Sequence, residues 1–136
     1  MRKLTIKLKN KHPFEIDVKK IILGLTERIV IQGHDGEHMA LAKIDTGASK
    51  SSIDLNLALN LKLGPVVESR IVKSAHGNKL RPVIDADILL GGKRVRAKFT
   101  LADRAHMRYK VLIGENILRS GYLIDPSLRK PKADPL

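Results

Sequence analysis

The stretch Lys43-Ile44-Asp45-Thr46-Gly47-Ala48-Ser49 decides how this chain folds. An apolar run leads into an acidic residue, a hydroxyl residue, a glycine and a small residue. Much later, Leu112-Ile113-Gly114-Glu115-Asn116-Ile117-Leu118 places a glycine between two apolar pairs. Glycine has no Cβ, so it lets two backbone segments approach closely. Gly114, after Ile113, therefore permits a close contact with another backbone segment.

The composition bounds the class of protein. A chain of 136 residues fits one domain, and 43% apolar with 3% aromatic residues fits a small aliphatic core. Cysteine is absent, which excludes a disulfide framework and thiolate metal ligands. The basic N-terminus is not followed by an apolar stretch, and apolar runs reach only about five residues, far short of a membrane span. We expect no signal peptide, no membrane contact and a cytoplasmic location.

The net charge of +12 favours an acidic partner, such as RNA, a ribosome surface or an acidic peptide tail. The alternative is a solvated, lysine-rich surface that only improves solubility. Two Phe and two Tyr provide few rings for base stacking, so we do not expect nucleic acid as the main ligand. A preference for acidic substrates is favoured over nucleic-acid binding, although composition alone does not show it.

Short apolar alternations separated by turn residues predict a mainly β, barrel-like domain with one or two short helices. The turn pairs Asp35-Gly36 and Gly91-Gly92 each predict a hairpin. A short helix is expected over residues 114–120. Strands are expected over residues 27–32, 39–45, 66–74, 80–90, 93–102, 109–113 and 122–125.

We expect three parts along the chain. Residues 1–26 form a basic extension in which residues 4–8 alternate as an edge strand. Residues 27–126 form the domain, and residues 127–136 form a loose tail.

Residues 55–63 allow two interpretations. Leucine at every second position predicts a strand. However, Asp54 suits a helix N-cap, Gly64 suits a helix end, and Pro65 follows.

The Asp-Thr-Gly loop and the later Ile-Gly pair resemble the catalytic loop and buttress of a retropepsin-like aspartic peptidase. The resemblance covers about residues 27–126 and extends to Ser51-Ser52-Ile53, Met107-Arg108-Tyr109 and Tyr122-Leu123-Ile124-Asp125-Pro126-Ser127. It is greatest to the branch often labelled ATP-dependent zinc protease, some members of which occur beside or fused to ATP-grasp ligases. Glu115 stands where relatives commonly carry Arg. The resemblance implies a closed acid-protease barrel and tips residues 55–63 towards a helical turn.

The resemblance further implies a homodimeric aspartic-type endopeptidase acting on peptide or isopeptide bonds. The chain has one Asp-Thr-Gly, and the chemistry needs two carboxylates, so two Asp45 residues would meet on a two-fold axis. Thr46 and Gly47 would hold the paired loops. Ala48 lacks a hydroxyl that could support the ionised carboxylate, which favours a less acidic working range. The resemblance also makes Ala75, His76, Gly77 and Asn78 candidates for the tip of a flap over the site.

The zinc label draws attention to His34-Asp35-Gly36-Glu37-His38, which spells H-x-x-E-H. That motif binds zinc on a helix, whereas Asp35-Gly36 predicts a hairpin, so we expect no metal ligand here and no cofactor. Asp103-Arg104 with Arg108 could bind acidic side chains, but a structural ion pair is favoured. Two alternatives to the aspartic peptidase stay open: an adaptor domain working with an ATP-grasp ligase or a ribosome, and the zinc protease that the label suggests.

Overall fold

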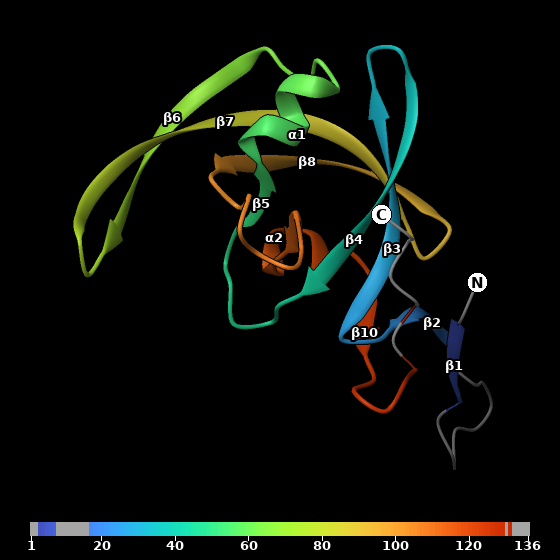
Figure 1. The fold of residues 1–136 in the computed structure, drawn as a ribbon. Coiled ribbons are helices and arrows are strands. Elements are labelled where there is room, and N and C mark those ends of the chain that lie inside the picture. The colour runs from blue at the N-terminus through green and yellow to red at the C-terminus, as the bar shows by residue number, and fades with distance from the viewer. Residues whose placement is uncertain (1–2, 8–16, 130, 132–136) are drawn as a thin grey trace.

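The computed structural model describes residues 3–7, 17–129 and 131 (Figure 1). The predicted N-terminal extension and C-terminal tail lie partly outside these residues. Strands and two short helices form the described chain. In order they are β1 (Lys3–Lys7), β2 (Asp17–Leu23), β3 (Thr26–Gly33), β4 (Gly36–Ile44), β5 (Ser51–Asp54), α1 (Leu55–Asn60), β6 (Val66–Ser74), β7 (Gly77–Leu90), β8 (Lys93–Ala102), β9 (Val111–Ile113), α2 (Glu115–Leu118) and β10 (Tyr122–Ile124).

Six of the strands close into a barrel. The larger sheet runs β3-β4-β9-β5-β8-β7-β6, and an additional pairing of β3 with β7 joins its ends, leaving β6 outside the ring. The interior is mainly aliphatic, and Phe99, Ile31 and Ile113 are each 0% exposed. The predicted closed, mainly β barrel is therefore confirmed.

The predicted hairpins form where glycine permits unusual backbone. Gly33 pairs with Gly36 around a two-residue turn, and Gly36 has φ +130°. Gly91 and Gly92, with φ +60° and +78°, connect β7 to β8. Several boundaries differ from the prediction: β4 begins at Gly36 and not at residue 39, β9 begins at Val111 and not at residue 109, and β7 begins at Gly77 and not at residue 80. The turn before it needs only two residues, since Gly77 adopts φ +105°.

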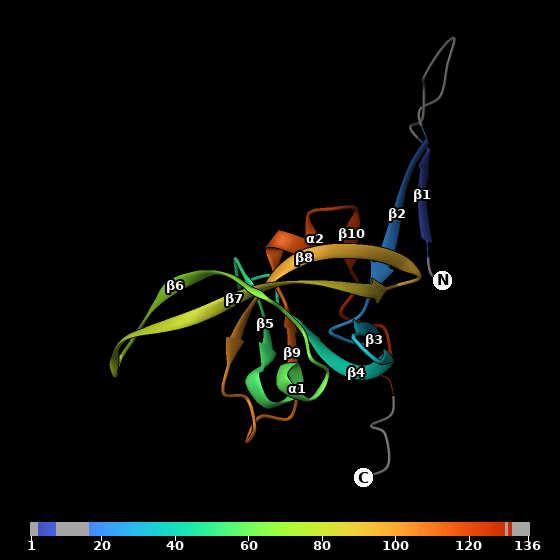
Figure 2. The same cartoon turned by 90° about the horizontal axis from the view of Figure 1, so that it is seen from above.

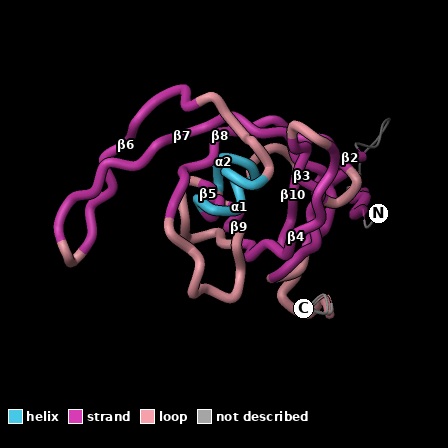
Figure 3. Tube along the Cα trace, turned by 45° about the horizontal axis from the view of Figure 1, so that its top comes forward, coloured by secondary structure: helices cyan, strands magenta, loops and turns pink. Residues whose placement is uncertain are grey.

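Residues 55–60 form a helix, so capping outweighs the leucine alternation. The Asp54 side chain accepts a hydrogen bond from the backbone N–H of Leu57 at 3.2 Å, which is an N-cap. Ala58 is the buried residue of this helix, while Leu59 stays 64% exposed. Both helices contact β5 and β8, and Figure 3 shows them beside the same strands. Neither helix in the described residues has the length and apolarity needed to cross a membrane.

A smaller sheet, ordered β1-β2-β10, places β1 at its edge. Strand β10 runs parallel to β2 and pairs Tyr122 with Ile21. The Tyr122 hydroxyl donates to the carbonyl of Leu90 at 2.9 Å, which ties this sheet to the end of β7. Burial raises the pKa of Tyr122 to about 12, so the hydroxyl keeps its proton as a donor. Figure 2 shows this sheet and the β6–β7 hairpin at opposite ends of the molecule.

The buried Asp54 should be important for stability, because its two oxygens serve two elements. Oδ2 caps α1, and Oδ1 accepts the backbone N–H of Arg104 at 2.8 Å. Replacing Asp54 by Ala removes a cap worth about 1 kcal/mol and leaves a buried amide unpaired, at a cost of about 1–3 kcal/mol. Urea unfolding should therefore show a loss of about 2–4 kcal/mol. Asp54→Asn retains one acceptor oxygen and should lose less; an equal loss would contradict this account.

Candidate active site

Asp45 lies in a tight turn directly after β4. Strand β4 runs parallel to β9, and the Asp45 N–H donates to the carbonyl of Ile113 at 2.9 Å. The backbone N–H of Gly47 donates to the Asp45 carboxylate at 2.9 Å, and that of Ala48 donates to the Asp45 carbonyl at 3.2 Å. Asp45 is half-buried, and Thr46 and Gly47 are exposed. The turn thus holds one carboxylate oxygen in place and leaves its tip open to solvent.

Gly114, a residue of the predicted buttress, lies against the segment that follows Asp45. A Cβ on Gly114 would overlap the carbonyl oxygen of Lys50 and would lie 2.7 Å from that of Ala48. Its φ of −107° is open to any residue, so the constraint is space and not backbone conformation. Only glycine fits here without moving the loop.

The first two backbone amides of α2, and that of Gly114 before it, bond to the segment after Asp45. Glu115 N–H donates to the carbonyl of Ala48 at 2.8 Å, and Asn116 N–H donates to that of Ser49 at 3.3 Å. The N–H of Gly114 donates to the hydroxyl of Ser51 at 2.9 Å. Amides at a helix start lack partners within the helix. Here the Asp45 loop supplies those partners, so loop and helix position one another.

Ser51 and Asn116 are site residues to which the sequence analysis assigned no role. The Ser51 side chain, 1% exposed, donates to Oδ1 of Asn116 at 2.7 Å. Asn116 in turn donates from Nδ2 to the carbonyl of Lys98 in β8 at 3.1 Å. The Ser51–Asn116 bond joins residues 65 positions apart, so no local pattern could have revealed it.

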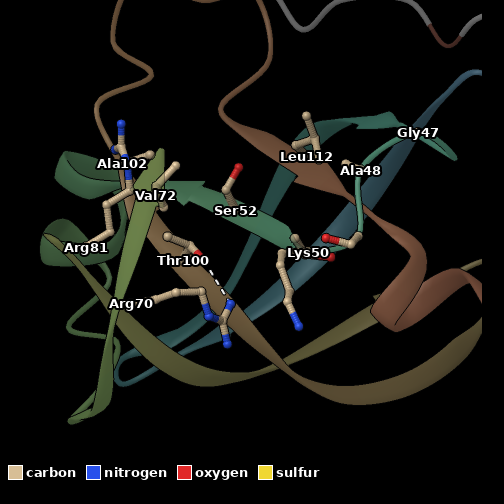
Figure 4. A pocket seen from close by; sticks show the side chains of 12 residues that line it. Gly47, Ala48, Lys50, Ser52, Arg70, Val72, Arg81, Thr100, Ala102 and Leu112 are labelled. Atoms are coloured by element: carbon tan, nitrogen blue, oxygen red, sulfur yellow. Dashed lines mark hydrogen bonds between the residues drawn. The ribbon is translucent and has the colours of Figure 1, made fainter. Parts of the chain in front are cut away.

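A cleft of about 480 Å³ opens beside the Asp45 loop (Figure 4). Its walls come from that loop, from the β6–β7 hairpin, and from β8 and β9. Three of the described lining residues are cations, and none is a carboxylate. The lining residues are Gly47, Ala48, Ser49, Lys50, Ser51, Ser52, Arg70, Val72, Arg81, Thr100, Ala102 and Leu112.

The predicted flap residues lie at the tip of the β6–β7 hairpin. Ala75 and His76 form the turn, followed by Gly77 and Asn78 at the start of β7. Figures 1 and 2 show this tip projecting away from the barrel. The shaft of the hairpin, and not its tip, lines the cleft. A closing movement of the tip over Asp45 therefore stays a prediction.

Arg104 contacts the chain's own backbone, which differs from the ion pair with Asp103 that was favoured from the sequence. It is 7% exposed, and its Nε donates to the carbonyl of Tyr109 at 3.0 Å. Burial lowers the pKa of Arg104, while the nearby charge of Asp54 acts in the opposite direction. Asp103 is exposed and accepts the N–H of Ala105 at 3.1 Å. These contacts fix the loop between β8 and β9.

The H-x-x-E-H stretch does not fit a zinc site. His34 and Asp35 form the turn between β3 and β4, and His38 lies on strand β4. The motif needs a helix to bring both imidazoles to one face. Within the described part of the chain, no three His, Cys, Asp or Glu residues gather as metal ligands.

Substitution of Gly114 by Ala tests the buttress. The added methyl meets backbone carbonyls that cannot rotate away, so overpacking should cost about 1–3 kcal/mol. Chemical denaturation would measure this loss. Gly24→Ala is the matched control, because its nearest neighbour is a side-chain carbon at 3.2 Å. Unchanged stability in the Gly114 variant would contradict the proposed packing.

A family model described as "RimB-like: Retropepsin-like aspartic endopeptidase RimB" matches residues 58–134. The match contains Ile113 and Gly114 but begins after the Asp45 loop. The family assignment therefore rests on residues 58–134 and is independent of the Asp-Thr-Gly motif.

Two curated relatives match a shorter stretch of 63 residues. They are a "Probable alpha-L-glutamate ligase" of Shewanella pealeana, 38% identical, and one of Shewanella halifaxensis, 36% identical. Each match covers 46% of this chain and only 14% of the relative, so the chain spans a small part of their length.

Solved structures share the fold. Protein Lpg0085 of Legionella pneumophila, of unknown function, superposes with a TM-score of 0.55 at 23% identity and covers 80% of this chain and 95% of its own. EIAV protease superposes with a TM-score of 0.55 at 21% sequence identity, and the match covers 69% of this chain and 84% of the protease chain. Simian foamy virus protease superposes with a TM-score of 0.50 at 15% sequence identity, and the match covers 68% of this chain and 92% of the protease chain. These likenesses show the fold, and the family match over residues 58–134 shows that the chain belongs to the RimB-like family of retropepsin-like aspartic endopeptidases.

Proposed function

We propose that the protein is a homodimeric aspartic-type endopeptidase whose active site pairs Asp45 with Asp45 of a second copy. The observation that carries the proposal is the fixed turn at Asp45, where the Gly47 amide holds one carboxylate oxygen at 2.9 Å. The second oxygen stays available to a water molecule or to the partner carboxylate. Family membership supports peptidase chemistry in general, and the turn supports Asp45 as its source.

The two carboxylates would share one proton. At a separation of about 4 Å and an effective dielectric of about 20, two negative charges repel by about 4 kcal/mol. One Asp45 is then ionised and takes a proton from water as it attacks the scissile carbonyl. The other, protonated, donates a hydrogen bond to the carbonyl oxygen as negative charge develops there. No covalent intermediate with the enzyme is needed.

The exposed turn tip supports assembly with a second copy. Thr46 is exposed beside Asp45, and its hydroxyl can hydrogen-bond the partner loop. Gly47, also exposed, allows the two backbones to approach closely. A monomer would supply one carboxylate where the chemistry uses two, so dimerisation is part of the mechanism.

The cleft supports an acidic peptide or isopeptide as substrate. Lys50, Arg70 and Arg81 line it, so a substrate carboxylate would meet positive charge from two walls. The net charge of +12 adds long-range attraction for such a substrate.

A second candidate function is an adaptor domain that works beside an ATP-grasp ligase or on a ribosome. It is favoured by the stretch shared with proteins named probable alpha-L-glutamate ligase. In that case the same cationic cleft would bind an acidic chain without cleaving it. Cleavage that depends on Asp45 separates the two functions.

Asp45→Asn should abolish cleavage of an acidic reporter peptide, because neither member of the pair could then act as the base. We expect a loss of at least about 10³-fold in kcat/KM, with the unfolding midpoint and the solution mass retained. Mass spectrometry of the products gives the readout.

Asp35→Asn, in an exposed turn away from the cleft, is the matched control and should cleave normally. Addition of a chelator should leave the wild-type rate unchanged. Full activity of Asp45→Asn together with loss of activity on chelation would overturn the proposal in favour of a zinc enzyme. Binding without any cleavage would favour the adaptor.

A further inference from the structure

Arg70 and Glu68 form an ion pair at the base of the flap hairpin. Glu68 on β6 accepts a hydrogen bond from Nη2 of Arg70 at 2.8 Å. The same carboxylate lies 3.7 Å from Nζ of Lys98 on β8. The other guanidinium nitrogen, Nη1, lies 3.5 Å from the hydroxyl of Thr100 (Figure 4). One carboxylate is thus held between two cations, and one of those cations lines the cleft.

The cleft side of the hairpin concentrates positive charge. Arg70 and Arg81 are directly opposite each other across β6 and β7, and both line the cleft. Like charges at paired positions of a sheet repel, so this pair favours an anion beside it. In the structure the anion that contacts Arg70 is Glu68, a residue of the chain itself.

The Arg70–Glu68 pair should exchange readily. Their side chains are 27% and 39% exposed, and ion pairs in contact with solvent contribute only about 0–1 kcal/mol. If Glu68 leaves Arg70, Lys98 is still near its carboxylate. Thr100, 6% exposed, is still near Arg70 and holds the guanidinium at the cleft. After such an exchange the Glu68 carboxylate would still have Lys98 nearby, and the Arg70 guanidinium would still have Thr100 nearby.

We propose that Glu68 is an internal placeholder, which occupies Arg70 until a side-chain carboxylate of a bound acidic peptide displaces it. Arg70 is then the specificity-determining residue of the flap, because its planar guanidinium can take a carboxylate through two parallel hydrogen bonds. Glu68 lowers the affinity for acidic peptides and selects against weak, singly charged ligands. This inference rests on the proposed acidic-peptide function of the cleft.

Peptide binding to the cleavage-inactive Asp45→Asn protein tests the placeholder. The probes are a fluorescein-labelled peptide of alternating Glu and Ala, and the matched peptide of alternating Gln and Ala, followed by fluorescence anisotropy. Adding Glu68→Gln should lower the Kd of the acidic peptide by about three- to tenfold, because Arg70 is freed. Adding Arg70→Gln should raise it by about tenfold, equivalent to about 1.4 kcal/mol. The Gln peptide should respond to neither change.

Controls separate exchange from damage to the fold. Asp87→Asn breaks a comparable pair, Arg96 with Asp87 at 3.0 Å, which is exposed and lies outside the cleft. It should leave both affinities unchanged. Arg70→Lys keeps the charge but loses the planar fork, and should bind the acidic peptide between wild type and Arg70→Gln. Glu68→Gln combined with Arg70→Gln should match Arg70→Gln alone.

The outcomes are decisive in both directions. If Glu68→Gln weakens binding of the acidic peptide, as Arg70→Gln is expected to do, then Glu68 holds Arg70 in position for the peptide. That result would contradict the placeholder role of Glu68. Equal affinity in all variants would also overturn it. Because the readout is binding by an inactive protein, absence of cleavage by wild type would overturn the proposed peptidase and leave this inference standing.

Discussion

The contact between Gly114 and the carbonyls after Asp45 is the constraint on which the site depends. A side chain at Gly114 would occupy the space of the Lys50 and Ala48 carbonyl oxygens. With that space free, the first amides of α2 reach the loop and bond to it. A short helix, which is weak by itself, therefore gains its cap from the loop that it supports. Helix α2 and the Asp45 loop are stabilised by the same few hydrogen bonds.

Strand β8 of the barrel forms part of the cleft beside the Asp45 loop. Strand β8 carries Thr100 and Lys98, which approach the flap strand β6, while its backbone accepts a hydrogen bond from Asn116. The strand thus connects the cleft cations with the helix that holds the Asp45 loop. A retropepsin-like barrel of this kind joins a rigid carboxylate turn to an extended, cationic hairpin. The hydrogen bonds at the turn and the solvent-exposed ion pair on the hairpin are the features on which the proposed peptidase and its proposed acidic substrate rest.

Residues whose role depends on local chemistry could be predicted from the sequence. Asp45, Gly47 and Gly114 were predicted as site residues from the resemblance of their segments to a retropepsin-like peptidase, and the structure places Gly114 against the segment that follows Asp45. The helix at residues 55–60 was ambiguous, since capping by Asp54 competed with leucine alternation. The sequence did not reveal the roles of four residues whose hydrogen-bond or ion-pair partners lie on other elements, because no periodic pattern in the sequence indicates such contacts. These residues are Ser51, Asn116, Glu68 and Arg70.

The central claim, that two Asp45 residues build one active site, is tested most directly by mixing subunits. Wild-type and Asp45→Asn chains would be unfolded together, refolded in equal amounts, and assayed at constant total protein. If both carboxylates are needed, only wild-type pairs are active, and random pairing leaves about one quarter of the wild-type rate. If each chain works with its own Asp45, the mixture retains about one half, and the paired site is contradicted.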